Sequence, residues 1–197
     1  MSLTANFKSN YLRGFDCRLS TFRNSLACND IVISNAMALG LSGCLVFCCN
    51  SGNEFKKIPY TIIAGISDQV IEGLSSRMNC YLFNSVFNID DDWTNEIKNY
   101  LDQNIPFNPA IDRSKLQQIR SGNGSSQFLN MGYHFVTITD YNQEKNLFTI
   151  IETDSSEEIF LTKEELKEIW FSDVLNKRKN REMLQTCNGQ WYGILTG

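Results

Sequence analysis

One cysteine and the only histidine of the chain are the residues best suited to covalent chemistry. Cys17 begins an expected helix, and His134 lies far downstream in the strand-like segment 132–140. An imidazole near a thiol raises the population of the thiolate, which is the nucleophilic form of cysteine. The unpaired amides of a helix N-terminus favour the same anion. The pair therefore predicts a nucleophilic Cys17 with His134 as its general base, although each residue alone also has an ordinary structural interpretation.

A third group that orients the imidazole completes such a catalytic apparatus. A hairpin whose turn lies near residues 142–146 pairs positions that sum to about 288, which places Asp154 opposite His134. Hairpin register depends on the turn type, so Glu152 and Asp140 remain alternatives. The predicted catalytic set is Cys17, His134 and Asp154.

The first half of the chain is expected to be mainly helical. Apolar spacing predicts helices over 17–29, 35–39, 66–78 and 90–102. Ser34 is expected to cap the second helix, which Gly40 and Gly43 end before a buried strand over 44–49. Residues 51–57 are expected to form a turn. The two prolines of segment 105–111 favour an edge strand or a partial strand there.

The second half is expected to form an antiparallel sheet. After a loop over 121–126, alternating residues predict strands over 133–139, 147–153 and 158–161. A helix should then cover 163–170, with Thr162 as its cap and Glu165 completing a capping box. Helices followed by an antiparallel sheet indicate an α+β fold. The length of 197 residues fits a single domain over 1–197.

The composition argues against several classes of function. The formal net charge is −4 and Lys and Arg are concentrated only in the run 177–179 with Arg181, so we expect no nucleic-acid binding. This basic run is interpreted as a solvated helix face, or else as a docking site for an acidic partner. Zinc-ligand spacing and phosphate-binding loops are missing from the sequence, and we expect no metal and no cofactor. Without a signal core or a long apolar run, the protein is expected to be cytoplasmic, with no membrane partner. Most of the seven cysteines, notably Cys44, Cys48 and Cys49, are interpreted as small buried hydrophobes rather than as a disulfide framework.

Several segments resemble one known family. Segment 16–26 has the pattern Cys-x-x-Ser-x-x-Arg-Asn-x-Leu, and segment 33–47 contains a serine-led Ala-Met-x-x-Gly-Leu stretch. Farther along come Ile105-Pro-Phe with Asp112, the Gly-Tyr-His-Phe-Val-Thr strand around His134, a strand ending at Asp154, and Leu161-Thr-Lys-Glu-Glu-Leu. Together, over residues 14 to about 170, they resemble the butirosin-type acyltransferase family, known by its N-terminal domain.

The resemblance implies a papain-like, peptidase C39-related fold whose cysteine forms amides instead of hydrolysing proteins. Such enzymes take an acyl group from the phosphopantetheine thioester of an acyl or peptidyl carrier protein and pass it to a small amine. The transglutaminase-like amide synthetase of closthioamide assembly is similar. Cys17 matches the nucleophile of this family, His134 the base and Asp154 the orienting acid. The implied partners are thus the carrier protein and the amine, in antibiotic or other secondary-metabolite biosynthesis.

The chain departs from these relatives in two places beside the expected nucleophile. Asp16 replaces the histidine usual before the cysteine, and Tyr11, next to Asn10, occupies the position of the glutamine that peptidases use as an oxyanion donor. Backbone amides at Cys17 are then the expected donors. Two other functions stay open: a C39-like cysteine peptidase, which Tyr11 disfavours, and a binding module that kept the fold without turnover. The sequence identifies neither the acyl chain nor the amine, and it leaves the substrate-binding residues and the oligomeric state unknown.

Overall fold

The architecture was analysed on a computed structural model of the chain. It describes residues 3–11, 17–42, 47–50, 60–63, 68–122, 133–153, 157–178, 181–186 and 189–196. In this part of the chain, no helix has both the length and the apolar character needed to cross a bilayer. Helices and antiparallel strands alternate over these residues, as expected for an α+β fold.

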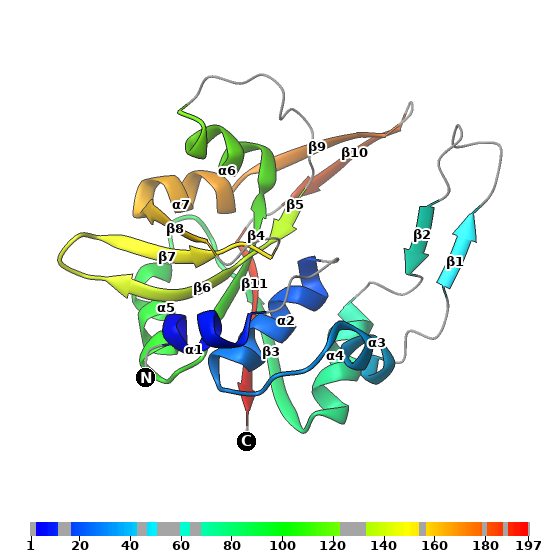
Figure 1. The fold of residues 1–197 in the computed structure, drawn as a ribbon. Coiled ribbons are helices and arrows are strands. Elements are labelled where there is room, and N and C mark those ends of the chain that lie inside the picture. The colour runs from blue at the N-terminus through cyan, green and yellow to red at the C-terminus, as the bar shows by residue number, and fades with distance from the viewer. Residues whose placement is uncertain are drawn as a thin grey trace.

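A seven-stranded antiparallel sheet forms the centre of the molecule (Figure 1). The strand order is β3-β11-β4-β6-β7-β8, and the short strand β5 pairs with β4 beside this path. The bounds are β3 Cys80–Val86, β4 Phe107–Asp112, β5 Tyr133–Phe135, β6 Thr137–Asn142, β7 Leu147–Ile151, β8 Glu158–Thr162 and β11 Gln190–Thr196. The last strand of the chain is therefore inserted between β3 and β4, which are much earlier in the sequence.

Helices cover both faces of this sheet. Helices α5 (Trp93–Asp102), α6 (Arg113–Arg120) and α7 (Lys163–Trp170) bury one face through a cluster that includes Trp93, Leu116 and Trp170. Helices α1 (Leu3–Asn10), α2 (Cys17–Cys28), α3 (Asn35–Ser42) and α4 (Asp68–Arg77) lie on the other face. Side chains alternate along β4, so that Phe107 and Ile111 join the first cluster and Ala110 joins the second.

Most predicted helices are confirmed, with small changes in length. α2, α5 and α7 form where apolar spacing predicts them, and the capping box of α7 is present between Thr162 and Glu165. The Ser34 hydroxyl accepts a hydrogen bond from the Met37 amide at 3.0 Å, as expected of a cap for α3. The predicted stop at Gly40 is wrong because α3 continues to Ser42. A glycine inside a helix costs only about 1 kcal/mol, which its neighbours can offset.

The predicted meander is also confirmed. β6 pairs with β7 at Thr137↔Ile151 and Ile138↔Ile150, the register expected near His134, and a bulge then shifts the pairing to Asp140↔Thr149. The strand predicted over 133–139 is interrupted at Val136, which separates β5 from β6. Asp154 and residues 51–57 lie outside the described part of the chain, as do residues 123–126 of the predicted loop.

The prediction of an edge strand at 105–111 is wrong. β4 is a central strand, buried along its whole length, that pairs with β11 on one side and with β5 and β6 on the other. The Pro109 carbonyl accepts from the Val136 amide at 3.3 Å, so the side of Pro109 that lacks an N–H faces the break between β5 and β6. A proline fits inside the sheet because the ladder is already interrupted opposite it.

Several strands were not predicted. They are β2 (Tyr60–Ile63), β3, β11 and the hairpin of β9 (Asp173–Arg178) with β10 (Arg181–Thr186). β2 pairs with β1 (Phe47–Asn50), which overlaps the strand predicted over 44–49. Part of the run 44–49 is thus in β1, while its first three residues, Cys44 included, lie outside the described residues. Of the basic run, Lys177 and Arg178 lie in β9 and Arg181 in β10, so its interpretation as a helix face is wrong. The sheet also draws β3 from the half of the chain expected to be helical.

Candidate functional site

Cys17 is the first residue of α2, where the helix dipole favours a thiolate. The residue is partly exposed and packs against the apolar cluster that also holds Phe135, the residue after His134. The thiol of Cys28, at the other end of the same helix, is only 1% exposed, and burial raises its pKa to about 12. Two cysteines of one helix thus have opposite environments, and Cys17 has the one suited to reaction.

His134 is the central residue of β5 and is only 4% exposed. It pairs with Ile111 of β4, so its side chain leaves the strand on the side opposite to Phe135. The ring then extends to Thr153, whose Oγ1 lies 3.2 Å from Nε2. Ile111, the partner of His134 across the ladder, joins the cluster under α5, α6 and α7, whereas Phe135 and its partner Ala110 join the cluster under α2. The imidazole therefore leaves β5 on the Ile111 side and is held at Nε2 by Thr153.

Two anchors fix α2 relative to the strands around His134. At the first turn of the helix, the guanidinium of Arg18 lies 5.3 Å from the centre of the Phe135 ring. Two turns later, Ser25 Oγ accepts from Asn108 Nδ2 at 2.9 Å, and Asn108 Oδ1 accepts from Thr137 Oγ1 at 3.0 Å. The helix therefore runs along β5 and β6 with its Cys17 end beside the strand of His134.

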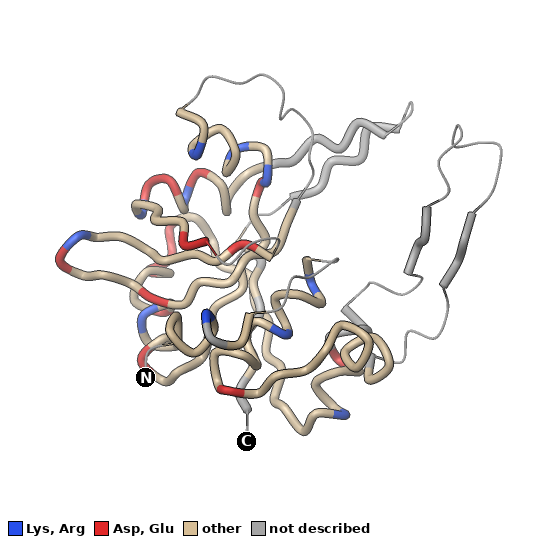
Figure 2. Tube along the Cα trace, in the orientation of Figure 1, with Lys and Arg blue, Asp and Glu red and all other residues tan. Residues whose placement is uncertain are grey.

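The three candidates for the group that orients the imidazole, Asp154, Glu152 and Asp140, differ in where the structure places them. Asp154 lies outside the described residues. Glu152 is buried and directs its carboxylate to α6, where Arg120 Nη1 lies 3.4 Å, Gln117 Nε2 3.5 Å and Arg113 Nε 4.0 Å away. Asp140 is exposed, near the far end of β6, and its Oδ1 accepts from the amide of Tyr141. The structure thus places Asp140 away from His134 and gives Glu152 an ion-pair role with the basic residues of α6. Figure 2 shows the Lys and Arg positions along α6 in blue.

The other residues of the resemblance serve local structure. Asp112 is the N-cap of α6, with Oδ1 accepting from the amides of Ser114 and Lys115 and Oδ2 accepting from Ser172 Oγ. Arg23 Nε donates to the Ile33 carbonyl at 3.0 Å, and its Nη1 donates to Asn35 Oδ1. Burial lowers the pKa of this guanidinium. The conspicuous Arg23 is therefore a brace between α2 and the start of α3.

The residues before α2 offer little for an oxyanion. Asn10 Nδ2 lies 3.4 Å from the Ala27 carbonyl and 3.2 Å from Asp30 Oδ1, so this amide already bonds to the end of α2. Tyr11 packs edge-on against Phe7 with 5.5 Å between the ring centres. Neither residue is placed as a free amide donor. The amides at the start of α2 therefore stay the expected donors.

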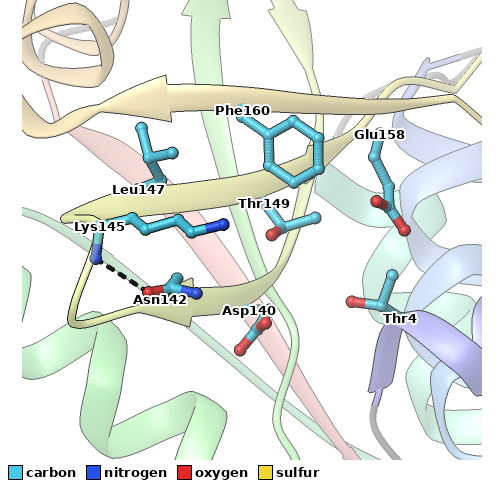
Figure 3. A pocket seen from close by; sticks show the side chains of 8 residues that line it. All are labelled: Thr4, Asp140, Asn142, Lys145, Leu147, Thr149, Glu158 and Phe160. Atoms are coloured by element: carbon cyan, nitrogen blue, oxygen red, sulfur yellow. Dashed lines mark hydrogen bonds between the residues drawn. The ribbon is translucent and has the colours of Figure 1, made fainter.

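An open groove of about 340 Å³ lies on another part of the sheet (Figure 3). It runs over β6, β7 and β8 beside Thr4, and Asp140, Thr149 and Phe160 line its middle as a cross-strand row. Its lining includes neither Cys17 nor His134. We therefore locate the candidate active site at the start of α2, not in this groove. Among the described residues, no three His, Cys, Asp or Glu side chains are grouped closely enough to hold a metal ion.

Sequence reasoning missed Thr153 and the buried group Ser25, Asn108 and Thr137. Asn108 had a visible signal, because an amide inside the otherwise apolar segment 105–111 needs a buried partner. Thr153 had a weaker signal in the sequence: the predicted register places its neighbour Asp154 opposite His134, so Thr153 also lies near the imidazole.

Comparison with known proteins gives one family. The model of the family described as "Butirosin biosynthesis protein H, N-terminal" matches residues 16–153. The match begins just before Cys17 and includes His134 and Thr153. A search of curated proteins finds no match.

Proposed function

Because the chain belongs to the butirosin biosynthesis protein H N-terminal family, we propose that it is a biosynthetic acyltransferase with Cys17 as nucleophile and His134 as base. The acyl donor is a thioester on the phosphopantetheine of a carrier protein, and the acceptor is a small amine. The observation that carries this proposal is the packing of the α2 start, with Cys17, against the strand that holds His134.

The reaction has two balanced steps. In the first, the Cys17 thiolate attacks the thioester carbonyl, a new carbon–sulfur bond forms, and the carrier thiolate leaves with the proton of the His134 imidazolium. In the second, the amine nitrogen attacks the acyl-enzyme and His134 takes a proton from that nitrogen. The amide bond forms as the Cys17 thiolate leaves. Amides at the start of α2 stabilise the oxyanion in both steps.

Two neighbours share the task of orienting the imidazole in this proposal. The hydroxyl of Thr153 holds Nε2 at 3.2 Å, which reserves Nδ1 for the thiol. Asp154, the next residue, supplies the charge that stabilises the imidazolium. The thiol must stay reduced for this chemistry, so we infer a reducing, cytoplasmic location.

Intact-mass spectrometry tests the proposal. The full chain is mixed with carrier proteins loaded with different acyl thioesters, and an acyl adduct is expected on the wild type and not on Cys17→Ala. Adding amines should discharge the adduct as an amide. A chain that forms no adduct with any carrier thioester is not an acyltransferase of this kind, and cleavage of leader peptides in the same samples would identify a peptidase instead.

A further inference from the structure

The strongest unassigned feature near the proposed site is the side chain of Asn108. It lies in the middle of β4, has no exposed surface, and points to the face of the sheet covered by α2. A buried amide that finds no hydrogen-bond partners destabilises the folded protein. Its partners come from α2, which begins at Cys17, and from β6, which follows the strand of His134.

The hydrogen bonds around Asn108 form a directed chain. Thr137 Oγ1 donates to Asn108 Oδ1 at 3.0 Å, and Asn108 Nδ2 donates to Ser25 Oγ at 2.9 Å. Ser25 Oγ donates in turn to the Thr21 carbonyl at 2.9 Å, and Thr21 Oγ1 donates to the Cys17 carbonyl at 3.0 Å. The chain connects the strand that follows His134 to the backbone of Cys17.

We propose that Asn108 is a positioning residue, which sets the register of α2 against β6 and so the placement of Cys17 relative to His134. This inference rests on the proposed function. Ser25 lies about 12 Å along the helix from Cys17, and Thr137 about 10 Å along the strand from His134. Apolar contacts alone would let the helix slide on the sheet, whereas a buried amide that bonds to both Ser25 of α2 and Thr137 of β6 favours a single alignment. A helix transmits any slide in full to its first residue.

The reactivity of Cys17 toward iodoacetamide, followed by peptide mass spectrometry from pH 5 to 9, is the measurement. Asn108→Ala and Thr137→Val should each slow alkylation of Cys17 at pH 7 by roughly 10- to 30-fold, to the level of the few per cent of thiolate in a free cysteine. Their pH profiles should move to that of a free thiol. Thr137→Ser, which keeps the hydroxyl, should recover most of the rate.

Leu166→Ala is the matched control for a general loss of stability. Leu166 is equally buried but packs in α7 on the opposite face of the sheet. This variant should lower the melting temperature and leave the pH profile of Cys17 unchanged. The positioning role is overturned if Leu166→Ala slows alkylation as much as Asn108→Ala, or if Asn108→Ala keeps the wild-type profile.

His134→Ala separates this outcome from failure of the proposed function. A wild-type Cys17 that reacts no faster than Cys17 in His134→Ala overturns the catalytic pair and the role of Asn108 with it. A wild-type Cys17 that reacts faster, together with an unaffected Asn108→Ala, overturns only the positioning role.

Discussion

Replacing Glu152 by Gln tests whether this carboxylate is a structural ion or orients the imidazole. Its side chain is 5% exposed, and Arg120 Nη1 lies 3.4 Å from Oε2. At an effective dielectric constant of about 20, one such pair is worth about 5 kcal/mol before desolvation is counted. Arg120 is 32% exposed, which screens the pair, and desolvation of Glu152 opposes it. We expect a net loss of about 2 kcal/mol.

A loss of about 2 kcal/mol lowers the melting temperature of a chain of this length by about 4–8 °C. Thermal and urea unfolding of Glu152→Gln measure it, with Glu157→Gln as matched control. Glu157 pairs with the same Arg120 at 3.1 Å but is 70% exposed, so its variant should lose no more than about 0.5 kcal/mol. Iodoacetamide labelling of Cys17 should change less than about threefold in both variants, because the catalytic pair is intact. Unchanged stability with a collapse of Cys17 labelling in Glu152→Gln would refute this reasoning and make Glu152 the orienting acid.

Three other predictions concern residues with well-defined surroundings. Cys28, with a pKa of about 12, should resist iodoacetamide at pH 8 in the folded protein and react only in urea. Peptide mapping measures the labelling of Cys28 and Cys17 in the same sample. Labelling of Cys28 as fast as that of Cys17 in native buffer would contradict its burial. Gly189→Ala should lower the free energy of unfolding in urea by at least about 3 kcal/mol, because the φ of Gly189 is +75° and a Cβ would lie 2.0 Å from the Phe87 carbonyl oxygen. Gly40→Ala, in α3 with open space around it, should instead stabilise the protein by about 0.5–1 kcal/mol. Equal effects of the two substitutions would contradict this prediction. Thr162→Ala removes the capping box of α7 and should cost about 1 kcal/mol, seen as a fall of about 2–4 °C in melting temperature that Lys163→Ala, next to it, does not share.

Local signals in the sequence were sufficient to predict the elements whose boundaries are set by neighbouring residues. The capping box of α7 and the turn between β6 and β7 lie within a few residues of the strands and helix they define, so both could be predicted. The register of that hairpin near His134 followed from the turn alone. The site could be predicted only as far as Cys17 and His134 as candidates.

The remaining features depend on partners far away in the sequence. β11 pairs with β3 and β4, more than seventy residues earlier, and no local pattern names such a neighbour. Pro109 predicts an edge strand unless the break at Val136 is known, and that break is a property of the opposite strand. Asn108 meets Ser25 and Thr137 only after the helix and the strands have packed. Tertiary contacts, not propensities, decide these positions.

The break at Val136 gives the strand of His134 its own unit of local unfolding. β5 has three paired residues, all with β4, while β6 and β7 pair with each other over a longer ladder. We expect the opening of β5 to break few strand hydrogen bonds and to leave the meander folded, while it exposes the buried His134 and Phe135. Amide hydrogen exchange should be faster at Phe135 than at Ile138. The strand that carries the imidazole can thus move relative to β6 and β7 without breaking their ladder.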